Sequence, residues 1–187
     1  MRCFLALPLP AAICRGVTAV QEALRIRCGE ADVRWSRPET SHLTLQFLGN
    51  VERDRMLALV PALGAEVATH RIARLALHGV GAFPSPRRAR VLWLGVTDGG
   101  PALIHLANAL WRVTSPLGVP AESKPFTPHL TLGRVRAPQR GADLAAAIAA
   151  CAPSDGGAWT PDAVVLFESR LHPKGALHEA LATLSLQ

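Results

Sequence analysis

Short apolar runs, rich in leucine and valine and bounded by turn residues, recur along the chain and predict strands. They lie at 2–7, 42–48, 75–80, 90–96, 129–135 and 163–169. Longer stretches with apolar residues at helical spacing separate them, near 11–28, 53–69, 101–114 and 141–151. Strands and helices in this mixed order, with hairpin-like neighbours, indicate an α+β fold rather than a parallel doubly wound sheet.

The chain has 187 residues, which suits a single domain over 1–187 or two closely joined lobes that share a cleft. Nearly half of the residues (49%) are hydrophobic and only 18% are charged, so the chain can build a core. This composition excludes disorder on the scale of a whole domain.

Arginine supplies 18 of the 20 basic residues, and the formal net charge is +6. A guanidinium group fits phosphate geometry and keeps its charge, so this balance suits an anionic ligand such as nucleic acid or a nucleotide. A GC-rich genome, which favours arginine codons, would explain the same excess. Charge alone therefore fixes no function.

The apolar run 3–14 resembles a secretory signal superficially. However, Pro8 and Pro10 break a helical segment, and Ile13 precedes Cys14 where a small residue would be needed. We expect a strand followed by a turn instead, no transmembrane helix and a cytoplasmic protein. The cysteines form no C-x-x-C pair and are expected to be reduced: Cys3, Cys14, Cys28 and Cys151.

The most informative feature is an internal repeat of the sequence His-Leu-Thr-Leu. It occurs at 42–45 and again at 129–132, so the two histidines are 87 residues apart, close to half the chain length. Two copies at so long a period do not make a solenoid. They predict two similar lobes, each contributing one strand to a common cleft.

Side chains alternate between the two faces of a strand, so each motif places its histidine and threonine on one face and its two leucines on the other. The same alternation places Gln46 with the first histidine and Phe47 with the leucines. Helical folding would scatter the polar pair by about 200°. The side chains expected to face the cleft are His42, Thr44, His129 and Thr131.

Two imidazoles and two hydroxyls suit phosphodiester hydrolysis without a metal. One histidine can accept a proton from water while the other, protonated, donates to the departing oxygen. The threonine hydroxyls can stabilise charge on the non-bridging oxygens. We expect a bell-shaped pH dependence with both limbs near neutrality. The motifs are nearly identical, so they do not distinguish the acid from the base.

The two motifs carry a resemblance to a known superfamily, together with Leu48-Gly49 after the first copy, the opening run 2–7, Val33-Arg-Trp35 and the ending 167–171. Over essentially its whole length the chain resembles the 2H phosphoesterases, which carry this HXTX motif twice. Within them it is most similar to the RNA 2′,3′-cyclic phosphodiesterases, also called 2′-5′ RNA ligases. The resemblance implies a bilobal fold with pseudo-twofold symmetry and an active site between the lobes.

The resemblance also implies an activity and roles for individual residues. It implies that a 2′,3′-cyclic phosphate is opened to a 2′-phosphate, with His42 as proton donor and His129 as the acceptor that activates water. It further suggests that Arg134 assists phosphate or base binding, although strict alternation puts Arg134 on the core side unless the strand bulges near Gly133. RNA ends or cyclic nucleotides would be the partners of a monomer that needs no cofactor.

Four further features are candidates for substrate binding. Phe47 would either stack on a base or join the core, and Trp35 would form a cleft wall or pack between the lobes. Lys124 precedes the second motif and could reach the phosphate. The cluster of Arg87, Arg88 and Arg90 beside a proline-rich loop would hold an RNA backbone or be a solvated loop.

The remaining histidines lack metal-ligand spacing and are expected to be surface or core residues: His70, His78, His105, His172 and His178. No P-loop sequence occurs, so ATP-driven ligation is not supported, whereas ATP-free joining remains open. Two alternatives also remain. The substrate could be a 2′-5′ oligonucleotide or an ADP-ribose cyclic phosphate, or the protein could be an RNA-end-binding module without catalysis.

Overall fold

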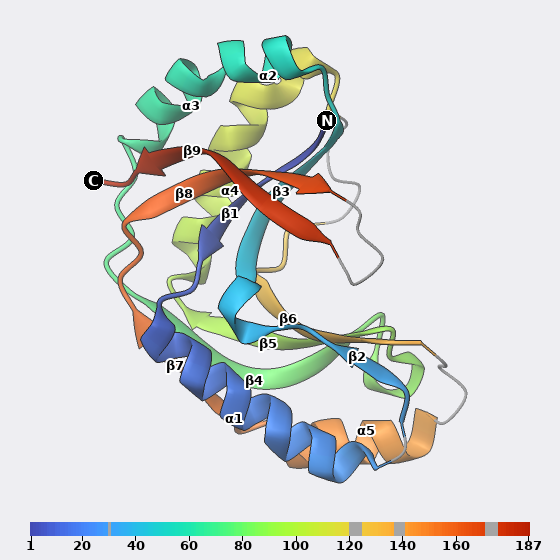
Figure 1. Ribbon diagram of the computed structural model, residues 1–187. Coiled ribbons are helices and arrows are strands. Elements are labelled where there is room, and N and C mark those ends of the chain that lie inside the picture. Colours follow the sequence, from blue (N-terminus) through green and yellow to red (C-terminus); the bar gives the residue numbers. More distant parts are fainter. Residues whose placement is uncertain (30, 120–124, 137–140, 171–175) are drawn as a thin grey trace.

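A computed structural model describes residues 1–29, 31–119, 125–136, 141–170 and 176–187, with the side chains of 144–150 but not of 141–143 in the last helix. The strands form two antiparallel sheets that lie between two outer layers of helices (Figure 1). Sheet A has four strands, in the order β3 (His42–Asn50), β1 (Arg2–Pro8), β8 (Ala163–Arg170) and β9 (Leu177–Ser185). Sheet B has five, in the order β2 (Val33–Trp35), β6 (His129–Val135), β5 (Val91–Asp98), β4 (Leu75–Phe83) and β7 (Asp155–Trp159).

The helices complete two lobes. Lobe A consists of sheet A with α2 (Arg53–Ala58), α3 (Val60–Val67) and α4 (Gly100–Thr114). Lobe B consists of sheet B with α1 (Ala11–Cys28) and α5 (Gly141–Ala150). Figure 1 shows α2 and α3 beyond sheet A, α1 and α5 beyond sheet B, and the two sheets between them. The α+β, two-lobed architecture expected from the sequence is confirmed.

The two lobes exchange helices. Helix α1 follows β1 of sheet A along the chain but packs against β7 of sheet B, and α4 follows β5 of sheet B but packs against β3 of sheet A. Each helix buries an apolar stripe at helical spacing, as the pattern of 101–114 predicts. Helix α1 also approaches β7 closely, because a Cβ on Gly16 would lie 2.5 Å from the carbonyl oxygen of Gly156.

The stretch 53–69 was expected to be one helix and forms two, which is a correction. The break falls between Ala58 and Val60, at Leu59. Pro61 follows in the first turn of α3, where a proline is tolerated because its missing N–H has no partner there. A continuous helix would lose a hydrogen bond and clash at that proline, so the chain starts a new helix instead.

Three strands were not predicted. Strand β2 has only three residues, β7 is glycine-rich, and β9 lies at an edge of sheet A and leaves most of its side chains partly exposed. Their sequences carry a weak apolar signal because each is stabilised by its neighbour rather than by its own buried face. None of the helices described in the structure is long and apolar enough to cross a membrane.

Candidate active site

The two His-Leu-Thr-Leu motifs lie on two strands that contact each other across the lobes. Strand β3 is the edge strand of sheet A. Strand β6 lies second in sheet B, but its outer neighbour β2 pairs only with residues 133–135 and leaves the motif end of β6 uncovered. Strands β3 and β6 contact each other, so the tertiary fold brings together motifs that are 87 residues apart.

Within each motif the expected alternation is observed. The four leucines are at most 5% exposed and belong to the core: Leu43, Leu45, Leu130 and Leu132. The two histidines and two threonines are half-buried on the opposite faces of their strands: His42, Thr44, His129 and Thr131. The leucines thus anchor both motif strands, and the polar side chains are free to face a ligand.

Beyond the motifs, the alternation is reversed by a bulge at the second leucine of each copy. In β3, Leu5 pairs with Gln46 and Ala6 with Thr44, so Leu45 has no partner on β1. In β6, Leu92 pairs with Gly133 and Trp93 with Thr131, so Leu132 has no partner on β5. An extra residue shifts the side chains that follow it to the other face of the strand.

The bulge makes the predicted orientations of Gln46 and Phe47 wrong. Gln46 is buried, and its amide donates to the Thr114 hydroxyl of α4 at 2.8 Å. Phe47 is 58% exposed on the face that carries His42. It lies across from Phe4, with ring centroids 6.2 Å apart.

The equivalent bulge in β6 brings Arg134 to the face of His129. Arg134 is exposed, whereas Gly133 takes the buried position that Gln46 occupies in β3. Gln21 of α1 is buried, and its side-chain amide donates to the backbone carbonyl of Leu132, the bulged residue, at 2.8 Å. The same amide donates to the backbone carbonyl of Ser36 at 2.9 Å. Helix α1 therefore holds the bulge in place from the core side.

Both catalytic candidates are oriented by the same backbone contact. The Nδ1 atom of His42 lies 3.2 Å from the carbonyl oxygen of Thr40, and that of His129 lies 2.7 Å from the carbonyl oxygen of Thr127. A carbonyl oxygen only accepts, so each Nδ1 carries the proton and donates it. In the neutral imidazole this leaves Nε2 unprotonated, as a base requires, while a protonated imidazole could donate from the same atom.

Burial perturbs both imidazoles in the same direction. Desolvation lowers the pKa of His42 to about 4, against the opposing effect of the hydrogen bond to Thr40, and the neighbouring His178 lowers it further. Desolvation likewise lowers the pKa of His129, and Arg134 adds to this effect. Both rings are therefore neutral near pH 7 in the absence of a ligand, and an anion beside them would favour protonation.

Aromatic side chains from other strands of the same sheet contact both histidines. In lobe A, Phe4 stacks on His42 with centroids 4.7 Å apart. In lobe B, Phe83 meets His129 edge to face at 4.9 Å and lies 5.3 Å from Trp93. These neighbours come from strands paired at long range, and no local sequence signal marks them.

Two buried nitrogens beside the motifs lack a hydrogen-bond partner among the described residues: Trp93 Nε1 and His178 Nδ1. Trp93 lies directly opposite Thr131 on the adjacent strand. His178 was expected to be an ordinary surface or core histidine, yet its ring centroid lies 5.2 Å from that of His42. The proximity of His178 to the site was missed because β9 was not predicted.

The other predicted binding residues are placed differently. Trp35 lies on the core-side face of β2, against Gly133 and beneath the guanidinium of Arg25, 5.4 Å from the ring centroid. This position favours packing over a cleft wall. Lys124 lies outside the described residues. Arg87 and Arg88 are exposed on the short helix Pro86–Arg88, which packs on α5, and Arg90 is also exposed.

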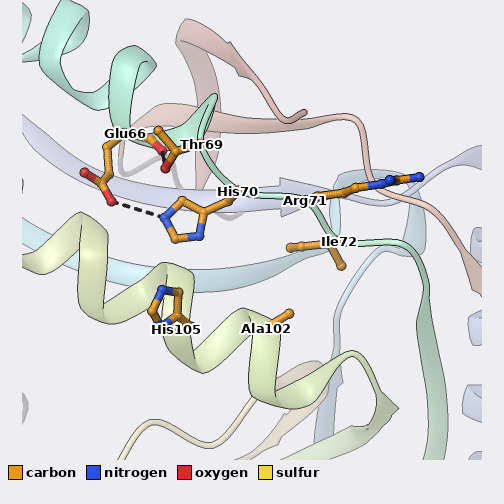
Figure 2. Close-up of a pocket in the computed structure, with 7 residues that line it drawn as sticks. All are labelled: Glu66, Thr69, His70, Arg71, Ile72, Ala102 and His105. Atoms are coloured by element: carbon orange, nitrogen blue, oxygen red, sulfur yellow. Dashed lines mark hydrogen bonds and ion pairs between the residues drawn. The ribbon is translucent and has the colours of Figure 1, made fainter.

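A hollow of about 380 Å³ lies elsewhere, on lobe A between α3 and α4 (Figure 2). The imidazole Nε2 of His70 and a carboxylate oxygen of Glu66 are hydrogen-bonded at 3.1 Å on its wall, opposite His105. No residue of either motif lines it, so it is separate from the candidate active site. Among the residues described, no group of three or more His, Cys, Asp or Glu side chains is arranged to hold a metal ion.

Comparison with known proteins agrees with this geometry. A family model described as LigT like Phosphoesterase matches twice in succession, at 7–93 and 94–178, with one motif in each match. An RNA 2′,3′-cyclic phosphodiesterase of Methanothermobacter thermautotrophicus is 28% identical over 100% of this chain and 99% of its own length. A protein of the same name from Thermus thermophilus is 32% identical over 100% of this chain and 91% of its own length. The alignment with that of Aquifex aeolicus, at 36% identity, spans 57% of each chain.

Solved structures lead to the same family. The Thermus thermophilus protein TT0787 superposes with a TM-score of 0.80 at 30% identity, over 100% of this chain and 98% of that one. Escherichia coli LigT complexed with 3′-AMP superposes with a TM-score of 0.74 at 26% identity, over 99% and 97%. From the two family-model matches, the two-lobed fold and the paired motif strands, we conclude that this chain belongs to the LigT-like phosphoesterase family, within the 2H phosphoesterases.

Proposed function

We propose that this protein is an RNA 2′,3′-cyclic phosphodiesterase that opens cyclic phosphates at RNA or nucleotide ends to 2′-phosphomonoesters. The observation that carries the proposal is the equivalence of His42 and His129. Each begins a motif strand, each donates from Nδ1 to the carbonyl two residues earlier, and each keeps Nε2 for a reacting proton. Full-length relatives named RNA 2′,3′-cyclic phosphodiesterase support the assignment of the substrate.

In the proposed reaction His129 is the general base. Its neutral Nε2 accepts a proton from water as the water oxygen attacks phosphorus. His42, protonated, donates its Nε2 proton to the 3′ oxygen as the bond between that oxygen and phosphorus breaks. The product carries a 3′ hydroxyl and a 2′-phosphate, and each imidazole has exchanged its protonation state. The same proton transfers with an RNA 5′ hydroxyl in place of water would join two strands without ATP.

The negative charge of the substrate favours protonation of His42. His42 is a poor proton carrier in the ligand-free protein, because burial lowers its pKa to about 4. The negative charge of a bound phosphate raises the pKa of nearby imidazoles. The hydroxyls of Thr44 and Thr131 lie on the faces that carry the two histidines and would donate to the non-bridging oxygens. No metal ion is required in this scheme.

Two further side chains have the placement needed to bind the nucleotide. Phe47 is exposed on the face of His42 and would stack on a base. Arg134 is exposed on the face of His129 and would contact phosphate. We also propose that residues 1–187 act as one unit, because α1 and α4 each complete the lobe opposite to the sheet that precedes them. We expect a cytoplasmic monomer.

A substrate panel tests the proposal and separates it from its alternatives. It contains 2′,3′-cyclic mononucleotides, an RNA oligomer ending in a cyclic phosphate, a 2′-5′ dinucleotide and an ADP-ribose cyclic phosphate. Turnover and affinity are measured separately. Turnover of the cyclic phosphates, with the 2′-phosphate as product in phosphorus NMR, is the expected result.

Other outcomes would point elsewhere. A preference for the 2′-5′ dinucleotide or the ADP-ribose compound would keep the mechanism and change the substrate. Binding without any turnover would identify an RNA-end-binding module instead. His105→Ala serves as the matched control, since His105 lines the separate hollow on lobe A and should not affect turnover.

A further inference from the structure

Two arginines lie side by side where the second motif strand meets its outer neighbour. Arg34 of β2 and Arg134 of β6 are direct partners in the antiparallel ladder. Directly opposed residues in such a ladder project from the same face of the sheet. Both side chains are exposed. The pair therefore presents two guanidinium groups next to each other on one face of sheet B.

That face is the one that carries His129. The bulge at Leu132 returns Arg134 to the side of His129 and Thr131. The opposite, core-side face at this point is taken by Val33 and Trp35, whose side chains a Cβ on Gly133 would meet at 2.8 and 3.3 Å. Arg34 lies between these two residues on β2 and so points away from the core.

The pairing of Arg34 with Arg134 lowers the stability of the sheet unless an anion binds between the two guanidinium groups. Like charges directly opposite each other destabilise a sheet. Among the described residues, no carboxylate oxygen lies within 4.0 Å of a guanidinium nitrogen of Arg34 or Arg134. Two adjacent planar donor groups match the oxygens of a phosphate.

We propose that Arg34 and Arg134 together bind the phosphodiester that precedes the cyclic end of an RNA strand, as a second phosphate site. This inference rests on the proposed function for its substrate. Arg134 follows His129 by five residues including one bulged residue, about 13 Å along the strand at 3.3 Å per residue. The charge of Arg134 still reaches His129, whose pKa it lowers, while Arg34 lies one strand further out, on β2. The pair thus extends from the side of the reacting phosphate toward β2, where the next nucleotide of a chain would run. The arginine pair would therefore raise kcat/KM for RNA ends above that for cyclic mononucleotides.

Arg34→Gln tests the site through two substrates compared side by side. The kcat/KM for a 2′,3′-cyclic mononucleotide should stay within about twofold of wild type, since that substrate has no second phosphate. The kcat/KM for a trinucleotide ending in a cyclic phosphate should fall by about 10-fold, the effect of one charge-assisted hydrogen bond. The salt dependence of trinucleotide binding should weaken by about 0.7 in log–log slope, the value for one contact on a single strand.

Binding is also measured directly, by fluorescence anisotropy with a labelled trinucleotide ending in a 2′-phosphate. This arm tests the arginine pair even if the wild-type protein turns over no cyclic phosphate, an outcome that would overturn the proposed function alone. Arg34→Lys should keep the salt slope while losing part of the affinity, because lysine keeps the charge without the planar fork. Arg112 is an exposed arginine of α4 in lobe A. Arg112→Gln is therefore the control and should leave kcat/KM unchanged for both substrates.

Two results would overturn the inference. One is an equal loss on the mononucleotide and the trinucleotide, which would place Arg34 at the reacting phosphate or in the fold. The other is unchanged trinucleotide affinity and salt slope in Arg34→Gln. A thermal melt separates folding from binding, since removing one of two like charges should leave the melting temperature unchanged or raise it.

Discussion

The imidazole of His178 lies edge-on to the imidazole of His42, with ring centroids 5.2 Å apart and an interplanar angle of 88°. Both rings also contact Phe4, which stacks on His42 and meets His178 edge to face. The proposed proton donor thus has a second titratable ring as its neighbour, and the charge on one ring affects the protonation of the other.

Replacing His178 with glutamine should raise the pKa of His42. His178 is one of the causes that lower this pKa, and a neutral amide cannot repel a protonated neighbour. The measurement is the pH titration of the His42 ring proton by NMR in the ligand-free protein. His105→Gln, in the separate hollow of lobe A, is the control. A pKa of His42 that is unchanged or lower in His178→Gln would contradict the prediction.

The pH optimum of kcat/KM should lie on the acid side of neutrality. The two limbs of a bell-shaped kcat/KM profile report the pKa values of the acid and the base in the free protein. In the free protein these are His42, at about 4, and His129, below its ordinary value of 6.5. The sequence alone predicted two limbs near neutrality, and the burial of both histidines moves the expected limbs of kcat/KM to lower pH.

The profile of kcat provides the comparison, because it reports the complex with substrate. It should be displaced to higher pH, since bound phosphate favours the protonated imidazoles. Profiles of both parameters on one cyclic nucleotide suffice. A kcat/KM optimum above pH 7 would show that the two rings are not desolvated as the structure indicates.

Folding stability should fall as the pH drops from 6.5 toward 4, partly because of His42. In this range the unfolded chain binds a proton at His42, whose ordinary pKa is 6.5, whereas the folded protein, with a pKa of about 4, does not. Proton uptake therefore favours unfolding, by on the order of 1 kcal/mol per pH unit for one group. Urea unfolding of wild type and His42→Gln across this range measures the effect. The variant should show the shallower dependence, and identical slopes would refute the assignment.

Both histidines should be essential, and a divalent metal should not. His42→Ala and His129→Ala should each lower the rate by on the order of 10²–10⁴-fold, as expected for loss of a general acid or base. Thr44→Val and Thr131→Val should cost roughly 10–10²-fold, because each removes a hydrogen bond to a charged oxygen. Saturating EDTA should leave the wild-type rate unchanged. Loss of activity with EDTA that Mn²⁺ or Zn²⁺ restores would defeat the mechanism.

Thr114→Val should destabilise the protein through the bulge in β3. The variant leaves the buried amide of Gln46 without the hydroxyl that it bonds at 2.8 Å, which costs about 1–3 kcal/mol. Chemical unfolding measures the loss, and kcat per folded molecule should change little. The double variant with Gln46→Met should recover much of the stability, since both polar groups are then removed. Equal destabilisation in the single and double variants would argue against this pairing.

Much of the site is determined locally and could be read from the sequence. A histidine and a threonine two residues apart share a face of any extended strand, and the leucines between and after them take the other face. The structure keeps this arrangement for His42 and Thr44, and for His129 and Thr131. The repeat itself predicted two similar lobes. These features depend only on the geometry of a single strand and on the burial of apolar side chains.

Other features were decided by strands far away in the sequence. The bulges at Leu45 and Leu132 arise from pairing with β1 and β5, and they alone determine that Phe47 and Arg134 face the site. Pairing of β9 with β8 brings His178 to His42, although no motif marks it. A strand's own sequence sets which residues alternate, but register, bulges and desolvation depend on the partners that tertiary packing supplies.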